Sequence, residues 1–512
     1  MNTSSCRTRC VSVLLHISCA VAASMTTAAA ASPPATTRAG LTAQIEAIVA
    51  QPRFAKATWG IAVTSLDDGR TLYKHRADRL MQPASTAKLF TAAVSLSTLG
   101  PDYRIPTRLL ADGTIRDGRL DGALILRGMG DPTLGTAGST DWADQLASQL
   151  AARGVKRIHG DLIADDSYFS GPSFGTGWEA GDLQSWFAVP SSALSVQENV
   201  VRVTVRPGSA VGLPAVLDFA PAEARPEVLG QLTTTPPRAP GDINLYRAPG
   251  EATLYAFGTI AANTPPQRFK LALTDPALIA GRQLRQALAR HGIRISGKLR
   301  VLHWPQDDSV LLAHADLLAE VLSPPLWQIL QRGLKRSQNL YLQNLLLSVG
   351  AYTQALAVND APPGFTSTET RGIHALDQLM AKIGVQSSAS LISEGAGLSR
   401  RDLVTPNAMV RLLAYLAAQP YAQRLRQALP IAGVDGTLSG HMRHTAAENN
   451  VHAKSGSMTY VHCLAGYVTS AAGERLAFAI MLNNYDRPDG APLASSDVDA
   501  IAVLLANYRG RD

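Results

Sequence analysis

The sequence predicts an α+β fold in which an antiparallel sheet is flanked by helices and interrupted by a large β-rich insertion. Three observations support this prediction. Strand-like runs lie near both ends of the chain, amphipathic helical patterns surround them, and the long stretch between is rich in short extended runs punctuated by Gly and Pro. With 512 residues, 46% of them hydrophobic, the chain exceeds one ordinary core and should form two or three domains.

The first predicted elements are a β-hairpin and a helix. Residues 59–66 alternate apolar and polar side chains, residues 67–69 supply a turn, and residues 71–75 resume the extended pattern. After Pro83, apolar residues at helical spacing predict a helix that ends at Gly100.

The last predicted elements complete the sheet. Residues 461–469 and 475–483 have the pattern of two paired strands, and a helix should follow from about 495 to 508. Lys454 lies on a strand just before them. The first hairpin and these three strands can therefore meet in one antiparallel sheet.

The chain between these ends is predicted to make excursions from a discontinuous catalytic domain, residues 40–100 and 310–512. Residues 101–309 should form an inserted β-rich module. Many prolines between 213 and 242 mark either a long exposed connection or a second subdomain, placed at roughly 208–255.

Residues 1–31 have the layout of a cleaved secretory signal. Arg7 and Arg9 precede the apolar stretch 11–23, and an alanine run follows at 28–31. A membrane anchor is the alternative, but the apolar run is shorter than the ~20 residues that a bilayer span needs. We therefore expect an exported protein of the periplasm or cell envelope without a transmembrane span, while peripheral association with the membrane stays open.

The cysteines and the net charge argue against three classes of protein: disulfide-bonded proteins, lipoproteins and nucleic-acid-binding proteins. Cys6, Cys10 and Cys19 lie in the signal, so cleavage leaves Cys463 alone, without an intramolecular disulfide. The residues before Cys19 do not resemble a lipobox, which disfavours a lipoprotein. The net charge of +7 is diffuse and compatible with an anionic envelope polymer, and no basic run interleaved with aromatics predicts nucleic-acid binding.

Three short strings carry the chemistry: Ser85-Thr86-Ala87-Lys88, Ser337-Gln338-Asn339 and Lys454-Ser455-Gly456. Each is weak alone. They nevertheless occur in the settings expected of an active-site serine enzyme, namely a helix start, a loop between two predicted helices, and a strand. Ser85 and Lys88 should project from the same side of the first helical turn, near its positive dipole end.

Three other kinds of site are less well supported by the sequence: a nucleophile elbow, a dinucleotide-binding loop and a metal site. Residues 171–175 fit the G-x-S-x-G elbow formally, but more glycines follow instead of a helix. Residues 128–132 miss a dinucleotide loop because Pro132 is not followed by a helical pattern. The eleven histidines form no ligand pattern, so neither a metal nor a cofactor is expected, and His452 should be a structural strand residue.

The chain resembles the low-molecular-mass class C penicillin-binding proteins, the D-alanyl-D-alanine carboxypeptidases and endopeptidases that trim bacterial peptidoglycan. The resemblance covers nearly the whole mature chain and implies a serine β-lactamase and penicillin-binding-protein transpeptidase-like fold. Gln338 and Ser455 depart from the usual Asp and Thr. Further family-like strings are Leu89–Ala92, Gly128–Pro132, Gly177-Trp178 through Pro190, Gly397–Arg400 and Gly433–Leu438.

The resemblance implies a role for each motif residue. Ser85 would attack the carbonyl between two D-alanines, with neutral Lys88 as its base, because burial and nearby Lys454 would both lower the pKa of Lys88. Ser337 would relay a proton to the departing amine, and Asn339 would bind the peptide backbone and Lys88.

Substrate binding is implied in the same way. The Lys454-Ser455-Gly456 strand would hold the terminal carboxylate, and the backbone amides of Ser85 and Ser457 would bind the oxyanion. A third-position diaminopimelate would meet a second group of residues: Asp182 at its ammonium, with Arg400 and Thr459 at its carboxylate. A solvated loop carboxylate and a structural ion pair remain the alternatives for Asp182 and Arg400.

The predicted function is thus a serine D-Ala-D-Ala carboxypeptidase or DD-endopeptidase. Its partners would be peptidoglycan peptides and β-lactams as covalent inhibitors, and nucleic acid is not expected. A β-lactamase and a non-catalytic peptidoglycan-binding protein remain as rivals. The sequence leaves open the balance of the two peptidase reactions, the third peptide residue and the oligomeric state.

Overall fold

A computed structural model describes residues 34–306, 308–356 and 364–511, and the chain from Ala35 onward forms one compact unit. The predicted signal, residues 1–31 with three of the cysteines, lies outside the described residues. Within the described part, no helix is both long and apolar enough to cross a bilayer.

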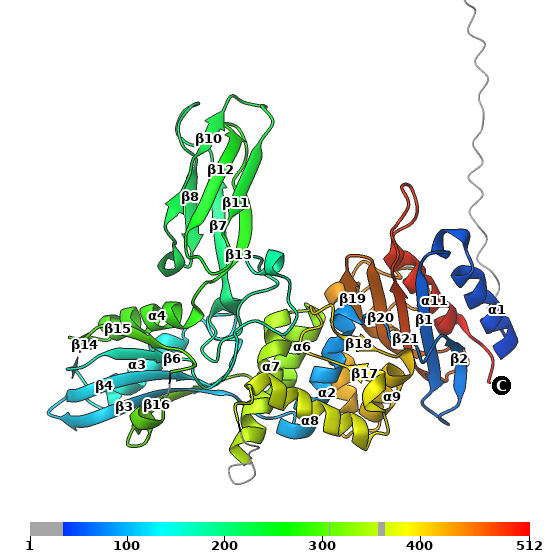
Figure 1. Ribbon diagram of the computed structural model, residues 1–512, viewed down its shortest axis with the longest axis horizontal. Coiled ribbons are helices and arrows are strands. Elements are labelled where there is room, and N and C mark those ends of the chain that lie inside the picture. Colours follow the sequence, from blue (N-terminus) through cyan, green and yellow to red (C-terminus); the bar gives the residue numbers. More distant parts are fainter. Residues whose placement is uncertain (1–33, 307, 357–363, 512) are drawn as a thin grey trace, which may run out of the picture. The chain divides into compact units, whose positions relative to one another are not determined.

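A five-stranded antiparallel sheet joins the two ends of the chain in the order β19-β20-β21-β1-β2 (Figure 1). The predicted meeting of the first hairpin with the last three strands is therefore correct. The pairing of β1 with β21 runs without a break from Thr58 opposite Asn483 to Ser65 opposite Leu476. The strand bounds are β1 Thr58–Ser65, β2 Thr71–His75, β19 His452–Met458, β20 Val461–Thr469 and β21 Arg475–Asn483.

Helices cover both faces of this sheet because its strands are apolar on both sides. One face packs against the first and last helices, α1 and α11, and the other against a group that includes α2 and α9. The bounds on the first face are α1 Arg38–Val49 and α11 Ala494–Asn507. Those of the second group are α2 Lys88–Leu99, α6 Leu326–Lys335, α7 Asn339–Leu356, α8 Thr368–Lys382, α9 Pro406–Ala417 and α10 Ala422–Ala428.

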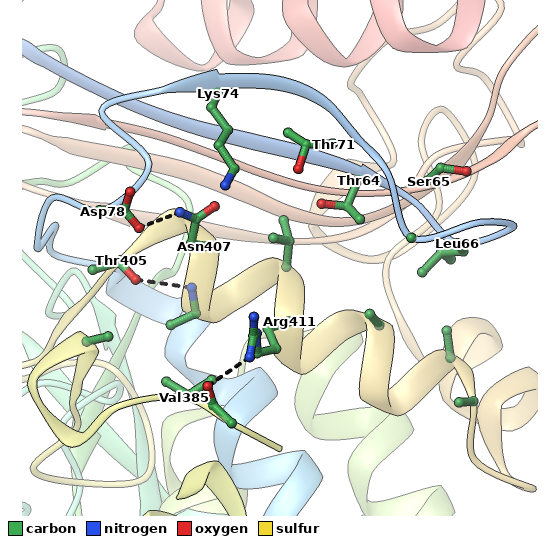
Figure 2. Close-up of a pocket in the computed structure, with 18 of the residues that line it drawn as sticks. Thr64, Ser65, Leu66, Thr71, Lys74, Asp78, Val385, Thr405, Asn407 and Arg411 are labelled. Carbon is green, nitrogen blue, oxygen red and sulfur yellow. Dashed lines mark hydrogen bonds between the residues drawn. The ribbon is translucent and has the colours of Figure 1, made fainter. Parts of the chain in front are cut away.

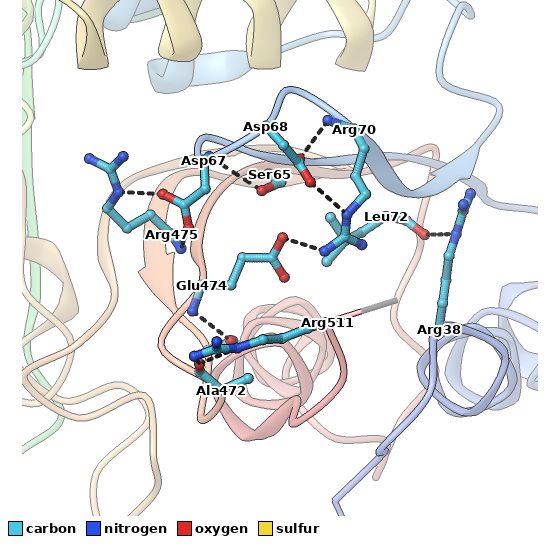
Figure 3. Close-up of polar contacts among 11 residues, drawn as sticks. Arg38, Ser65, Asp67, Asp68, Arg70, Leu72, Ala472, Glu474, Arg475 and Arg511 are labelled. Atoms are coloured by element: carbon cyan, nitrogen blue, oxygen red, sulfur yellow. Dashed lines mark hydrogen bonds and ion pairs between the residues drawn. The ribbon is translucent and has the colours of Figure 1, made fainter.

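Charged side chains tie the turn of the first hairpin to the turn between β20 and β21 (Figure 3). Arg475 donates to Asp67 at 2.7 Å, and Arg70 donates to Glu474 at 2.7 Å and to Asp68 at 3.0 Å. We call these five residues the hairpin ion cluster. Every charge in it has an opposite partner, as is usual for a solvated structural network.

The segment between α2 and α6 is rich in strands, as predicted. A seven-stranded sheet packs against α3 and α4, and a three-stranded and a four-stranded sheet follow. Residues 213–242, where a long connection was one alternative, contain strands β8, β9 and β10. The division into domains remains a prediction.

The remaining bounds complete the description of the chain. The seven-stranded sheet has β3 Pro106–Arg116, β4 Arg119–Gly128, β5 Arg157–Ile158, β6 Leu162–Asp165, β14 Arg294–Ile295, β15 Leu299–Leu302 and β16 Asp316–Leu322, with α3 Trp142–Ala152 and α4 Pro276–Arg290. The smaller sheets have β7 Val200–Arg206, β8 Val216–Ala220, β9 Val228–Leu229, β10 Leu232–Thr235, β11 Asp242–Tyr246, β12 Leu254–Ala261 and β13 Gln267–Ala272. Short elements are α5 Ser309–Leu312, β17 Ser390–Leu391 and β18 Leu403–Val404.

Candidate active site

Ser85 lies on a 3₁₀ turn, Ala84–Ala87, and Lys88 is the first residue of α2. The sequence predicted one regular α-helix here, so this detail is corrected. The turn begins at Ala84 with a φ of +46°, a left-handed conformation that is costly for alanine and often found at functional sites. A 3₁₀ turn places side chains three residues apart directly above one another. The Lys88 Nζ to Ser85 Oγ distance is accordingly 2.9 Å.

Lys88 is fully buried and has three polar neighbours. Its Nζ lies 2.9 Å from the Ser85 hydroxyl, 2.6 Å from Asn339 Oδ1 and 2.5 Å from the Ala396 carbonyl. A neutral amine has two N–H donors and one lone pair. The two carbonyl oxygens can use both donors, which leaves the lone pair for the Ser85 hydroxyl. Burial lowers the pKa of Lys88 to about 7, so this neutral form is accessible near neutrality.

Lys454 is a second fully buried lysine, on β19, and its Nζ donates to the Ser455 carbonyl at 2.6 Å. Burial, followed by the charge of Lys88, holds the pKa of Lys454 well below its usual value. Two ammonium groups in one buried space repel each other, so the protonation states of the two lysines are linked.

The loop between α6 and α7 brings Asn339 to Lys88. Ser337, in this loop, has a φ of +54°, which turns the chain sharply between the two helices. Asn339 uses both ends of its amide: its oxygen faces Lys88, and its nitrogen donates to the Phe187 carbonyl at 2.7 Å. Gln338 Nε2 lies 3.3 Å from Glu198 Oε2 instead, in keeping with the expectation that the middle residue points away.

A cavity of about 300 Å³ opens at Ser85 and is also lined by Ser337, Ser455, Gly456 and Ser457. The structure thus brings all three motifs to one space. The edge strand approaches the nucleophile closely, because a Cβ at Gly456 would lie 3.1 Å from the backbone nitrogen of Ser85. The cavity therefore combines a serine that contacts an amine with hydroxyl groups and a close strand edge.

The three residues expected to read the third peptide residue lie near one another, but none of them is among the lining residues of this cavity. Arg400 Nε donates to Glu179 at 2.8 Å, and its Nη1 lies 3.4 Å from the Thr459 carbonyl. Burial and nearby Glu179 raise the pKa of Asp182, and Arg400 opposes them. A structural ion pair was the alternative kept open for Arg400, and the structure contains one, with Glu179, that occupies its guanidinium.

Sequence reasoning also missed two fully buried carboxyl groups behind Lys88, those of Glu394 and Asp402. Glu394 accepts hydrogen bonds from the backbone nitrogens of Ala396, at 2.6 Å, and Leu398, at 2.8 Å. Both carboxyl groups raise the pKa of Lys88, against the larger effect of burial. The only sequence signal was the neighbouring Gly397–Arg400 string, which was noted for its resemblance alone.

A larger cavity, of about 840 Å³, lies between the first hairpin and α9 (Figure 2). Its lining includes Lys74, Arg411 and Arg475, and none of the motif serines. Asp78 accepts from Asn407, and Arg411 donates to the Gly384 carbonyl at 2.8 Å. The larger of the two cavities is therefore not the candidate active site. The smaller cavity is identified by the contact between Ser85 and Lys88.

No group of three His, Cys, Asp or Glu side chains in the described ranges is arranged to hold a metal ion. The cavity at Ser85 presents a hydroxyl that contacts the buried amine of Lys88, together with the hydroxyl groups of Ser337, Ser455 and Ser457. Together with the sheet between two helical layers, this arrangement fits the class of hydrolases that use an active-site serine with a neighbouring lysine.

Comparisons with known proteins agree with that class. The family profile of the D-Ala-D-Ala carboxypeptidase 3 (S13) family matches residues 41–508. A D-alanyl-D-alanine carboxypeptidase of Actinomadura sp. (strain R39) is 34% identical over 483 residues, covering 91% of this chain and 84% of the relative. The D-alanyl-D-alanine carboxypeptidase DacB of Haemophilus influenzae is 30% identical over 437 residues, covering 84% and 86%.

Solved structures agree as well. The crystal structure of penicillin binding protein 4 (dacB) from H. influenzae superposes with a TM-score of 0.76 at 29% identity, over 91% of this chain and 99% of that one. This chain belongs to the D-Ala-D-Ala carboxypeptidase 3 (S13) family. The predicted fold class, the serine peptidase class and the carboxypeptidase reaction are confirmed, in preference to the β-lactamase and non-catalytic alternatives.

Proposed function

We propose that this D-Ala-D-Ala carboxypeptidase acts on peptidoglycan stem peptides through an acyl-enzyme on Ser85, and that β-lactams acylate the same serine. The contact of Ser85 with buried Lys88 carries the proposal, because a serine hydroxyl needs a base within hydrogen-bond reach. A second crystal structure of the H. influenzae protein, 26% identical with a TM-score of 0.71, is a complex with a β-lactam, which supports the inhibitor class.

In the acylation step, Lys88 takes the proton of the Ser85 hydroxyl while Ser85 Oγ bonds to the carbonyl carbon between the two D-alanines. The carbon–nitrogen bond then breaks, and the departing amine receives a proton by way of Ser337. A water molecule next attacks the ester and gives a proton to Lys88, which returns it to Ser85 Oγ as the ester bond breaks and the shortened peptide leaves. Asn339 holds Lys88 in place throughout through its 2.6 Å contact.

Charge that develops on the carbonyl oxygen needs preorganised donors. We assign these to the backbone nitrogens of Ser85 and Ser457, on two segments that Gly456 allows to lie close together. Lys454 and Ser455 bind the terminal carboxylate of the peptide. Loss of one such donor typically costs about 3 kcal/mol of barrier stabilisation.

Recognition of the third peptide residue is assigned to Asp182, Arg400 and Thr459. Their proximity supports this assignment, since Arg400 contacts the Thr459 carbonyl and acts electrostatically on Asp182. Glu179 must give up or share Arg400 when a side-chain carboxylate binds, because it holds the guanidinium at 2.8 Å. Cleavage of cross-links by the same machinery, and export to the periplasm, are parts of the same proposal.

Labelling with a fluorescent penicillin, followed by mass mapping of the adduct, tests the proposal. The label should lie on the peptide that contains Ser85, and Ser85→Ala should lose both the label and release of D-alanine by at least about 10⁴-fold. Ser173→Ala, in the loop that fits the elbow pattern formally, is the matched control and should leave both unchanged. Full D-alanine release by the Ser85→Ala protein would refute the assignment.

A further inference from the structure

Two of the ionisable groups that line the cavity at Ser85 and lie outside the three motifs form a pair, His441 and Asp499. His441 follows a 3₁₀ turn, Gly436–Leu438, and Asp499 lies on α11, and both line the cavity together with Ser85 and Ser455. His441 Nδ1 lies 2.7 Å from Asp499 Oδ2. The side chains are 31% and 15% exposed, so the pair is partly desolvated and still open to the cavity.

Backbone and side-chain contacts tie His441 to the motif strand. Thr437 Oγ1 lies 2.6 Å from Ser455 Oγ, and the backbone nitrogen of His441 donates to the Leu438 carbonyl at 3.0 Å. The turn that reaches Ser455 therefore also presents the imidazole. Since Nδ1 is used by Asp499, the ring nitrogen left for a ligand is Nε2.

Asp499 is the carboxylate that contacts His441, and the other charged groups nearby are paired elsewhere or lie outside the cavity lining. Asp497, on the same helix as Asp499, is neutralised by Arg53. On its own loop, Arg443 and His444 are exposed and do not line the cavity.

Strand β20 contributes an imidazole and a thiol to the cavity, those of His462 and Cys463. From β20, His462 lines the same cavity, and burial lowers its pKa, which favours its neutral form. The hydrogen bond to Asp499 raises the pKa of His441, burial opposes this effect, and the negative charge of Asp499 adds to it.

We propose that His441, held by Asp499, is a specificity-determining residue that binds the terminal carboxylate of the peptide substrate together with Ser455. This inference rests on the proposed function, which puts that carboxylate at Ser455. A neutral imidazole that donates from Nδ1 to Asp499 has only a lone pair at Nε2 and repels a carboxylate. The imidazolium donates from both nitrogens, so only the protonated ring binds the substrate.

Steady-state kinetics with two synthetic peptides test the inference, one ending in D-Ala-D-Ala with a free carboxylate and one with the same sequence ending in an amide. His441→Gln should raise KM for the acid about tenfold at pH 6.5, the usual loss of a charge-assisted hydrogen bond, with kcat nearly unchanged. KM for the amide should not change. An acid-to-amide ratio of KM values equal to that of the wild type would overturn the inference.

Two further variants keep the test sharp if His441→Gln alters folding. His441→Arg keeps a cation and should retain a low KM at high pH. Asp499→Asn should move the rise of KM with pH to lower pH, because the imidazole loses its partner. His444→Asn, a surface change in the same loop, is the matched control, and a change of the same size in it would overturn the inference.

The same experiment separates this inference from the proposed function. If the wild-type protein neither releases D-alanine nor takes a penicillin label on Ser85, the proposed function fails. If the wild-type protein does both, but His441→Gln leaves the acid-to-amide ratio of KM values unchanged, only the role assigned to His441 fails.

Discussion

The two buried lysines at Ser85 and the hairpin ion cluster are opposite ways of keeping charge in a folded protein. Lys88 and Lys454 have no exposed surface, and their Nζ hydrogen bonds go to neutral oxygens. In the hairpin ion cluster, Arg475 and Asp67 are 61% and 41% exposed and bind each other directly (Figure 3). Paired surface charges stay ionised and change little with pH, whereas buried amines lose their protons readily and become available as bases.

The largest expected effect is the difference in acylation rate between two lysine-to-methionine variants, one at buried Lys88 and one at Lys74. Lys88→Met removes the proposed base beside Ser85 and should lower the rate of acylation by about 10²–10⁴-fold, the usual contribution of a general base. Lys74→Met, in the larger cavity of Figure 2, is the matched control and should leave the rate within about twofold. Stopped-flow acylation by a chromogenic β-lactam measures both. Equal rates in the two variants would remove the distinction between the cavities.

The pH dependence of acylation should follow the base. Because the pKa of Lys88 is lowered to about 7, the reactive neutral amine is lost below that pH. The acylation rate should therefore fall about tenfold per pH unit below pH 7 and level off above it. The measurement is kcat/KM between pH 5 and 9 with the peptide that ends in an amide, because binding of that peptide does not depend on the charge of His441. A profile that stays flat down to pH 5 would show that another group takes the proton.

Stability should vary with pH for the same reason. The pKa of Lys88 is about 7 in the folded protein and near 10.5 in an unfolded chain, so between these values the unfolded chain binds more protons. The free energy of unfolding should therefore rise with pH across this window, by at most about 1.4 kcal/mol per unit from this group. Lys88→Met should reduce that slope in urea titrations. An unchanged slope would mean that Lys88 stays charged when buried.

The hairpin ion cluster should give the smallest effect. Arg475→Ala breaks an exposed pair with Asp67 and should lower the free energy of unfolding by about 0–1 kcal/mol, less at high salt. Catalysis should not change. Thermal unfolding at two salt concentrations measures this, and a loss well above that range, or one that salt does not reduce, would contradict the view that the cluster is a solvated network.

Local patterns account for what the sequence could predict. Alternation and a turn at residues 67–69 located the first hairpin, and the paired-strand pattern at 461–469 and 475–483 located β20 and β21 to the residue. The order of the three motifs then predicted which segments meet, although the first and last are more than 300 residues apart. The motifs were good predictors because each occurs in one kind of backbone element, and the local sequence around each motif also favours that element.

Contacts between distant side chains were not predictable in the same way. Glu394 and Asp402 act on Lys88, and His441 meets Asp499, only because helices and loops far apart in the chain pack together. None of these residues belongs to a periodic pattern, and each residue type is most often a solvated surface group. The 3₁₀ turn at Ser85 was missed for a related reason, since a left-handed alanine has no distinguishing sequence signal.

Two glycines enclose the turn that carries the nucleophile. A Cβ at Gly397 would lie 2.2 Å from the Ala84 carbonyl, and one at Gly456 would lie 2.7 Å from the Pro83 carbonyl, so main chain touches main chain on both sides. The turn consequently has no room to recede when a substrate arrives. If Ser85 forms the proposed ester, the adjustment to it must come from the peptide and from side chains, because main chain encloses this turn on both sides.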